Sequence, residues 1–511
     1  MRKIYSIRLL VPVLLMLLFS TDVSLIQAQN LFTSARNLSL GSGGTAYTYG
    51  YQSLFINPAN LGFFRGGKQI MIGLPGDISL SAGGSLANIS VYNQYFTGGN
   101  RIGASQVNSI VQKWFGNSMS QMHNIGVDAE VVPIAAVIKF GENTVVGASA
   151  RFRTLGHVGM NRGMAEFMLR GLDSQSFSQP TPVNMDQRMM STAELAVGLS
   201  HRFRFIGLLP DNQELWFGAT VQFIRGIDYS QGQFRSTLQL TDSSLVHKFN
   251  YTLETVGSMT NELDQFYQQR INPTTQPQLS DIRFRPLSGK GIIKGSGYGF
   301  DFGATYLISF DDEYTSGKRA LPKHSLTLSA AVTDIGSVRF TQNAAIFSAS
   351  STFNWSGFQP DYNYIDAKYD SSFSNYMDYV VKDSLASDVY GAFSPSSHSA
   401  IKAKLPTAFH FGAYLNLHRL GVMVDAGKGY NSYGMNSTRP YVSVGAELYP
   451  LSILPVRVGY RFGGKTSNSF GLGTGLEFRN FKLNVSAMTV PSSRERGYNI
   501  ATAVSSVILL Y

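Results

Sequence analysis

The feature that most constrains this chain is a strict alternation of apolar and polar residues in its C-terminal part. Segment 470–478 carries phenylalanine, leucine and threonine at even positions, with glycine and one glutamate at odd positions. Segments 456–462 and 481–487 alternate in the same way, and all their ionisable residues fall on the non-apolar side. Since successive side chains of a β-strand point to opposite faces, these segments predict strands with one apolar and one polar face.

Segments of this kind recur along most of the chain and predict an all-β protein. They are 69–81, 126–140, 144–155, 193–205, 214–229, 297–310, 324–335, 408–417, 420–427, 442–448, 456–462, 470–478, 481–487 and the last strand. The prediction is an antiparallel barrel of about 14 strands, because closure removes the unpaired edges that a lipid environment cannot solvate.

Alternation also suits a secreted β-sandwich, so other features must separate the two folds. The chain stops on Tyr511 at the end of the run IATAVSSVILLY, and a terminal aromatic residue resembles the signal recognised by the outer-membrane barrel assembly machinery. Charged residues make up 14% of the chain, against roughly 25% in soluble domains. Both features favour a transmembrane β-barrel in the cell outer membrane, with lipid as one partner.

The N-terminal residues have the pattern of a secretory signal peptide. Basic Arg2, Lys3 and Arg8 precede an apolar run at 9–19, and a polar stretch ends at Ala28. The run is shorter than the roughly 20 residues that span a bilayer as a helix, so cleavage after Ala28 is favoured over an uncleaved anchor. The expected division is a signal peptide at 1–28, an N-terminal segment at 29–65 and a barrel at 66–511.

Long connections are predicted near 93–124, 156–191, 230–296 and 339–405. They contain apolar residues at helical spacing, which predict short helices: Val107, Ile110, Val111 and Trp114; Leu263, Phe266 and Tyr267; Phe373, Tyr376, Met377, Val380 and Val381. The aspartates of 355–390 lack the spacing of a calcium loop, so a solvated loop is expected there.

No motif predicts catalysis, a metal or a cofactor. The histidines have no metal-ligand spacing, the glycine clusters lack a phosphate-loop lysine, and no GxSxG sequence is present. The net charge of +10 includes no basic cluster, so nucleic acid is not an expected partner. The expectation is a protein without enzymatic activity, although a site assembled from several strands at a barrel rim remains open.

The most specific segment is 34–63, with the sequence SARNLSLGSGGTAYTYGYQSLFINPANLGF. It resembles the N-terminus of FadL-type and PorV-like outer-membrane proteins, in which a glycine-rich segment leads to an Asn-Pro-Ala-Gly motif. Asn57, Pro58 and Ala59 match that motif, Asn60 replaces its glycine, and Leu61 and Gly62 follow. Segments 326–340 and 454–464 resemble strands of an uncharacterised Bacteroidota branch related to both families.

The resemblance implies a hatch inside the barrel, with the motif residues Asn57, Pro58, Ala59, Asn60 and Gly62 forming a rigid turn. An ordinary turn before the first strand is the alternative. FadL-likeness implies binding or passage of a small hydrophobic molecule. PorV-likeness implies instead an accessory subunit of a secretion or surface-attachment complex, without transport, whose partners are secretion-system proteins. The sequence assigns no ligand-binding residues.

Overall fold

The structure of the protein is a computed structural model that describes only part of the chain. The described residues are 34–63, 68–86, 91, 94, 104–170, 175–203, 210–241, 244–272, 291–311, 322–356, 395–397, 400–464, 468–489 and 498–510. The predicted signal peptide at 1–28, the predicted helix around Tyr376, the acidic stretch from 357 to 390, and Tyr511 lie outside the described residues.

The strands form a closed antiparallel barrel of 14 strands, which confirms the predicted fold. Its wall contains β1 (Ile70–Gly73) with β2 (Asp77–Gly84), β3 (Met122–Phe140), β4 (Thr144–Asn161), β5 (Thr181–Phe203), β6 (Gln213–Leu240), β8 (Gly295–Ser309), β9 (His324–Phe340), β12 (Ile401–Lys404) with β13 (Ala408–Leu417), β14 (Leu420–Gly429), β15 (Tyr441–Leu451), β16 (Leu454–Gly463), β17 (Asn468–Glu477), β18 (Phe481–Thr489) and β19 (Tyr498–Leu510). The barrel closes because β19 pairs with both β1 and β2.

The two faces of the wall are as different as the sequence alternation predicts. On β16 and β17, Val458 and Leu472 are exposed on the outer face, whereas Arg457 and Glu477 are buried in the lumen. Exposed large apolar side chains recur around the barrel, for example Leu80, Leu199 and Phe302. An apolar exterior with charged residues inside is the arrangement that a lipid surrounding requires. No helix among the described residues is both long enough and apolar enough to cross a membrane.

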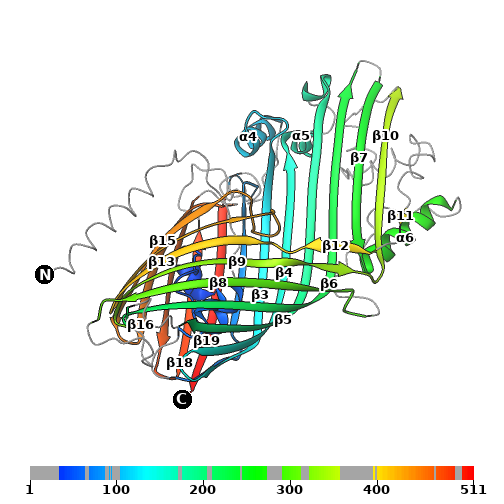
Figure 1. Ribbon diagram of the computed structural model, residues 1–511. Helices are drawn as coiled ribbons and strands as arrows, with labels where there is room; N and C mark the ends of the chain where they lie inside the picture. Colours follow the sequence, from blue (N-terminus) through cyan, green and yellow to red (C-terminus); the bar gives the residue numbers. More distant parts are fainter. Residues whose placement is uncertain are drawn as a thin grey trace.

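The two ends of the barrel differ. The end where β19 stops carries the short turns, such as Leu417 to Leu420 between β13 and β14, and is called the C-terminal rim. At the opposite rim, part of the sheet rises beyond the barrel (Figure 1). There the second half of β6 leaves β8 and pairs with β7 (Ser244–Val256), and β7 pairs with β10 (Ala344–Ser356). Residues 181–191 and 230–240, with β7 and β10, are called the flap.

The flap corrects three of the predicted connections. Segments 156–191, 230–296 and 339–405 are predicted as loops, yet they contain β7, β10 and the outer ends of β4, β5 and β6. Strand β7 carries Leu245, Phe249 and Leu253 on one face and mostly polar residues on the other, and β10 alternates in the same way at 347–350. Their polar faces are rich in serine, threonine and asparagine, which are also frequent in loops, and this composition hid the period-two pattern.

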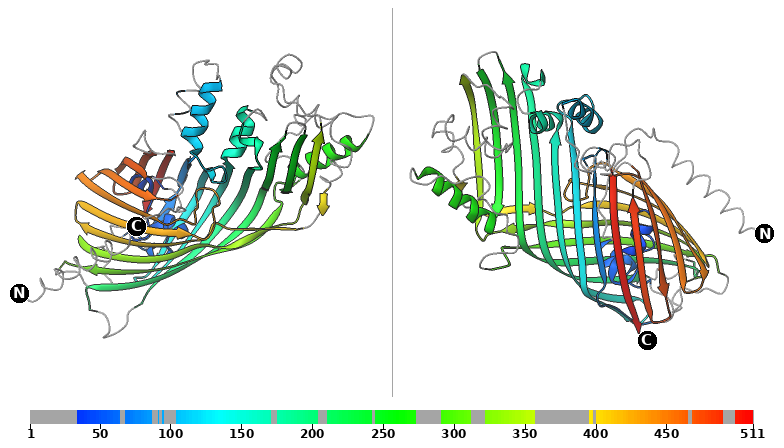
Figure 2. Two further views of the ribbon diagram at one scale, coloured as in Figure 1. Left: turned by 90° about the horizontal axis from the view of Figure 1, so that it is seen from above. Right: turned by 180° about the vertical axis from the view of Figure 1, so that it is seen from behind.

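Helices occupy the lumen and the opposite rim. Inside the barrel lie α2 (Ala35–Ser39), η1 (Gly50–Phe55) and η2 (Pro58–Asn60). Outside the opposite rim are α4 (Ala104–Phe115), α5 (Arg162–Arg170), η4 (Gln175–Ser178) and α6 (Ser258–Ile271) (Figure 2). The short helices predicted from apolar spacing at 107–114 and 263–267 are confirmed by α4 and α6.

Candidate functional site

Residues 34–63 lie inside the lumen and are called the plug. Figure 2 shows this blue segment enclosed by the red, orange and cyan strands. Its apolar side chains Leu38, Tyr51 and Leu61 are buried to 1% exposure or less. Helix α2 packs on β16 to β19, η1 packs on β1 and on β3 to β6, and η2 packs on β5, β6 and β8. The segment that resembles a hatch therefore lies inside the barrel.

The motif begins with a turn that Asn57 caps. Its Oδ1 accepts a hydrogen bond from the backbone N–H of Ala59 at 3.2 Å, and Pro58 occupies the first position of η2. Asn57 Nδ2 donates to the carbonyl of Thr45 at 2.8 Å and to Thr305 Oγ1 on β8 at 2.9 Å. One side chain thus shapes the turn and joins it both to the rest of the plug and to the wall.

Asn60, where the sequence departs from the family motif, makes side-chain hydrogen bonds that a glycine could not make. Its Nδ2 donates to the carbonyl of Thr45 at 2.9 Å, and its Oδ1 accepts from Thr305 Oγ1 at 2.6 Å. A further bond runs from Ser200 Oγ on β5 to the carbonyl of Ala59 at 2.8 Å. These buried bonds fix the motif between β5 and β8.

Glycines in the wall let the plug backbone approach closely. A Cβ on Gly218 of β6 would collide with the backbone of Pro58 and Ala59, and one on Gly471 of β17 would lie 2.5 Å from the carbonyl oxygen of Leu38. The motif residue Gly62 is equally restricted, because a Cβ there would lie 2.9 Å from Val145 Cγ2. The polar faces of the wall strands carry glycine where the plug leaves no space for a side chain.

Ion pairs attach one side of the plug to the wall. Arg36 Nη2 lies 2.7 Å from Glu447 Oε1 of β15, and Glu447 also pairs with Arg457 of β16 at 2.5 Å. Arg457 continues to Glu477 at 2.6 Å, and Glu477 pairs with Lys482 at 2.6 Å. Each buried charge has an opposite charge beside it, which is the condition for keeping charges away from water.

A second attachment uses a single carboxylate of β14. Asp425 Oδ2 accepts from the backbone N–H groups of Gly44 at 3.1 Å and Thr45 at 2.8 Å. Its Oδ1 accepts from Tyr441 O–H at 2.8 Å. The glycine-rich part of the plug is held here through its own backbone, which explains why small residues suffice in 41–46.

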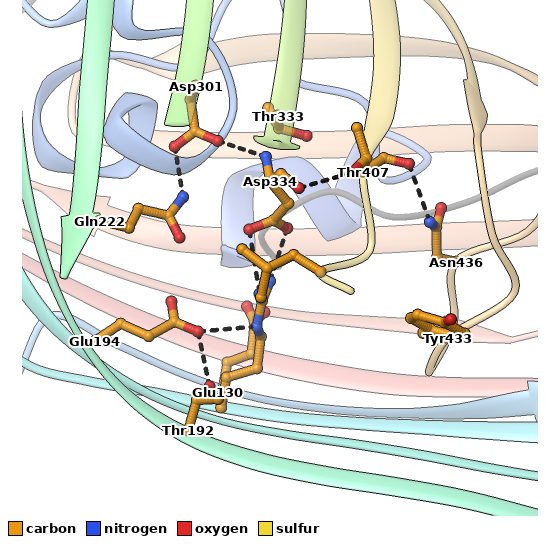
Figure 3. Close-up of polar contacts among 12 residues, drawn as sticks. Glu130, Thr192, Glu194, Gln222, Asp301, Thr333, Asp334, Thr407, Tyr433 and Asn436 are labelled. Carbon is orange, nitrogen blue, oxygen red and sulfur yellow. Dashed lines mark hydrogen bonds and ion pairs between the residues drawn. The ribbon is translucent and has the colours of Figure 1, made fainter. Parts of the chain in front are cut away.

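Charged side chains form a layer across the lumen next to the plug (Figure 3). Arg151 pairs with Glu194 at 2.5 Å, and Arg153 pairs with Asp334 at 2.9 Å. The backbone N–H of Asp334 donates to Asp301 at 2.6 Å. This charge layer, consisting of Arg151, Arg153, Glu194, Asp301 and Asp334, begins where the Arg151 guanidinium lies 4.0 Å from the ring centre of Phe55 in the plug.

Beyond the charge layer, toward the opposite rim, a cluster of buried apolar side chains lies where the lumen meets the base of the flap. Leu155 lies two residues beyond Arg153 on β4, and Ile224 lies two residues beyond Gln222 on β6, so both face the lumen one step closer to that rim. Tyr229 and Phe340 stack with ring centres 5.3 Å apart. The apolar layer consists of Leu155, Met190, Ile224, Tyr229, Val256, Val338, Phe340, Ala344, Ile401, Ala403 and Leu405.

The wall is interrupted beside these two layers. Strand β9 pairs with β13 as far as Thr333 and with β12 from Ser337, so 334–336 and 405–407 lie between two ladders. Across the interruption, Leu405 N–H donates to the carbonyl of Gly336 at 3.1 Å, and Thr407 Oγ1 donates to that of Asp334 at 2.7 Å. Figure 3 shows Thr407 joined to both Asp334 and Asn436.

The connection between β14 and β15 folds inward at the opposite rim. Met435 N–H donates to Asp128 Oδ1 on β3 at 2.8 Å, and Met435 is buried. The ring of Tyr433 lies 3.5 Å from the guanidinium carbon of Arg188 on β5. Asn431 Nδ2 donates to the carbonyl of Leu405 at 2.7 Å. This connection therefore joins three parts of the wall around the apolar layer.

The predicted motif residues lie within the described part of the chain, whereas the predicted assembly-signal residue does not. Asn57, Pro58, Ala59, Asn60 and Gly62 lie together in the buried turn described above. Tyr511 lies outside the described residues, and the strand that precedes it, β19, pairs Leu510 with Ile70. Within the described ranges, no group of three or more histidine, aspartate or glutamate side chains could hold a metal ion.

Sequence reasoning did not find the charge layer or the apolar layer. Alternation placed Arg151, Arg153 and Glu194 on the polar side of their strands, but only the strand register shows that they meet. Leu155, Ile224 and Val338 could not be assigned to a layer from the sequence, because an apolar residue at a lumenal position only weakens the alternation of its strand. Apolar residues at successive lumen-facing positions near one end of several strands are the pattern that could have predicted this layer.

Comparison with solved structures finds similar barrels at low sequence identity. The Pseudomonas putida toluene transporter TodX is 10% identical, covers 95% of this chain and 99% of its own, and gives a TM-score of 0.42. The Ralstonia pickettii toluene transporter TbuX is 11% identical over 94% and 100%, with a TM-score of 0.42. A Pseudomonas aeruginosa FadL homologue is 10% identical over 95% and 100%, with a TM-score of 0.44.

At the level of sequence, comparison with curated proteins finds no match. A family model does match, and it covers residues 64–487, which include most of the barrel wall. The plug lies before the matched region, so the match itself rests on the barrel and its connections. On this match, the protein belongs to the family described as Family of unknown function (DUF5723).

Proposed function

We propose that this protein is an outer-membrane barrel that binds a small hydrophobic molecule in the apolar layer and lets it pass. The observation that carries the proposal is the apolar layer itself. The interior of a water-filled barrel is polar, because its lining must hydrate the solutes that diffuse through it. The eleven clustered apolar side chains, which lie where the lumen meets the base of the flap, serve no such purpose but suit a hydrophobic ligand.

The charge layer limits the route that such a molecule can follow. Paired guanidinium and carboxylate groups lie between the apolar layer and the plug, and an apolar molecule moving through them would disrupt their pairing at high cost. The interruption between β9 and β12–β13 adjoins the apolar layer through Leu405. We propose that the molecule enters from the opposite rim and leaves sideways there, into the lipid, without displacing the plug.

The outer membrane as location is supported by the closed barrel and its apolar exterior. A barrel in lipid needs an outward apolar band, and the outward side chains of β8, β16 and β17 provide one. The C-terminal rim with its short turns would then face the periplasm, and the flap would project from the cell. We propose that the protein is not an enzyme and that the barrel assembly machinery is a partner only during its insertion.

A second candidate function is that of an accessory subunit in a secretion or surface-attachment complex. The observation that favours it is the flap, which extends the sheet beyond the opposite rim and is not needed to close the barrel (Figure 1). A projecting sheet offers a rigid surface to another protein. In this role the filled lumen would be structural, and nothing would pass through it.

Native mass spectrometry of the intact protein, purified from outer membranes in mild detergent, distinguishes the two functions. The first proposal predicts a retained hydrophobic molecule on a barrel without protein partners. The second predicts a stoichiometric protein partner and an empty barrel. An empty barrel without any partner, from preparations that retain lipid on a control barrel, would contradict the first proposal.

A further inference from the structure

Four adjacent strands of the wall carry positive charge on the outer face of the barrel. Strands β6, β8, β9 and β12 pair in that order near the opposite rim (Figure 1). Arg225 lies opposite Ser296 in the register, and Ser296 lies opposite Arg339. Arg339 in turn lies opposite Lys402, and Lys404 follows two residues later on β12. The exposed side chains of Arg225, Arg339, Lys402 and Lys404 are called the basic patch.

The basic patch points away from the lumen and has no acidic residue beside it on its own strands. Lys402 and Lys404 alternate with Ile401 and Ala403, which are buried in the apolar layer. The acidic residues of the same four strands are all buried: Glu214, Asp228, Asp301 and Asp334. Within the described part of the chain, no side chain of the basic patch forms an ion pair. Its charges are therefore open to an anion from outside the barrel.

Outward charge is not a general property of this wall. In strands β15 to β18 every charged residue faces the lumen, where it contacts the plug or an opposite charge: Glu447, Arg457, Arg461, Glu477 and Lys482. Charged residues on the lipid face of a barrel are destabilising, and the cost falls only toward the membrane interfaces. The basic patch thus departs from the pattern of the wall at one place, on four neighbouring strands.

The basic patch borders the apolar band of the outer face. Toward the C-terminal rim, the next outward residues are Phe223 on β6 and Tyr298 on β8, whose rings meet edge to face with centres 5.8 Å apart. Phe300 and Ile335 follow in the same direction and are exposed. Aromatic rings mark the boundary between the hydrocarbon and the lipid headgroups. The basic patch therefore lies at the level of headgroups, and lipid chains would lie beside Phe300 and Ile335.

Two cations of the basic patch face each other directly. Arg339 and Lys402 are cross-strand partners, and such partners have Cα atoms about 5 Å apart. Like charges in this position are destabilising. One basic residue at a membrane interface is explained by a long side chain that reaches water, but this does not explain two opposed cations. An anion between them would replace the repulsion by two attractions, and both side chains bind phosphate well.

We propose that the basic patch binds the phosphate groups of a lipid in the outer leaflet of the membrane. A lipid fits better than a free anion, because the basic patch continues without a break into the apolar band. Ser296, exposed between Arg225 and Arg339, adds a hydroxyl donor for the phosphate. The inference rests on the outer-membrane location within the proposed function and needs no molecule in the apolar layer.

A lipid competition with the full-length protein tests the inference. Wild-type protein, stripped of lipid in detergent, receives equal amounts of diphosphorylated lipid A and fully dephosphorylated lipid A. Native mass spectrometry then counts the retained molecules of each. The two probes share their acyl chains and differ only in phosphate, so the comparison isolates the charge. The wild-type protein should retain the phosphorylated form at least about tenfold more than the dephosphorylated form.

Matched variants show where the phosphate binds. Lys402→Gln should reduce the preference for the phosphorylated lipid, and the double variant Arg339→Gln/Lys402→Gln should abolish it. Lys248→Gln removes the same charge from an exposed position on β7, in the flap, and should keep the preference of the wild-type protein. A naphthalene probe for the apolar layer should bind the double variant as it binds the wild-type protein, so this inference and the proposed function fail separately.

Three results would overturn the proposal. Equal retention of the two lipids by the wild-type protein is the result expected if the aspartates of 357–390 neutralise the basic patch. An unchanged preference in the double variant would place the phosphate site elsewhere. An equal loss in Lys248→Gln and Lys402→Gln would make the preference a property of net charge alone.

Discussion

At the scale of single residues, the plug is held by side chains that each make several bonds. Asn57 and Asn60 both reach Thr45 and Thr305, so two amides join the plug to itself and to β8. Each of these groups is buried, and a lost partner would leave the other group without compensation. The motif thus attaches the plug to the wall, and Asn60 adds two hydrogen bonds that the glycine of the resembling families cannot make.

Replacing Asn60 with glycine is therefore expected to destabilise the plug. Asn60→Gly removes two buried hydrogen bonds and should lower the free energy of unfolding by about 1–3 kcal/mol. Urea unfolding in detergent, followed by tryptophan fluorescence, measures the change. Asn117→Gly, at an exposed position, is the control. Equal stability of the two variants would mean that the bonds of Asn60 contribute nothing.

The carboxylate of Glu447 should stabilise the barrel more than a neutral side chain at the same position would. It lies between Arg36 of the plug and Arg457 of the wall, so Glu447→Gln leaves two buried cations facing each other. Breaking a buried pair in this way costs about 3–5 kcal/mol. The temperature at which the barrel unfolds on a gel should fall clearly for Glu447→Gln and stay unchanged for Glu142→Gln, whose side chain is 55% exposed. An unchanged temperature for both would contradict the assigned role.

At the scale of elements, the sequence predicted the strands that have one face toward lipid and one toward the lumen. It did not predict the contacts that depend only on how those strands pack. Strands β16, β17 and β18 were found because one face of each must be apolar and the other carries Arg457, Glu477 or Lys482. Strand β10 was missed because its polar face is built of serine and threonine, which are also frequent in loops, although Phe347 and Ala349 alternate there with exposed serines. The position of the plug followed from its family resemblance, whereas the meeting of Arg153 with Asp334 depends on a register that no single sequence reveals.

The fit between wall strands and plug depends on glycine. Gly218→Ala should displace η2, because its Cβ would collide with the backbone of Pro58 and Ala59. Limited proteolysis should then cut the plug at least about tenfold faster than in the wild-type protein. Gly156→Ala is the matched control on β4, where a Cβ would meet atoms no closer than 3.6 Å. Equal cleavage of the two variants would show that the plug tolerates the extra atom.

At the scale of the whole molecule, the lumen is stacked in three levels: plug, charge layer and apolar layer. We expect the first two to close the barrel to water and ions, because most of their buried charged groups are paired with one another. In planar bilayers the wild-type protein should give no steady ion current, and deletion of 34–63 should produce open-channel steps. A steady current through the wild-type protein would show that a continuous aqueous path bypasses the plug.

The central claim is that the apolar layer binds a hydrophobic molecule, and a binding titration in lipid nanodiscs tests it most directly. The probe is a fluorescent naphthalene derivative, added to the wild-type protein, to Phe340→Ala in the apolar layer, and to Phe300→Ala on the outer face of the barrel. The account predicts saturable binding by the wild-type protein and by Phe300→Ala, with affinity at least about tenfold weaker for Phe340→Ala. Binding that is equal in all three proteins, or that never saturates, would contradict it.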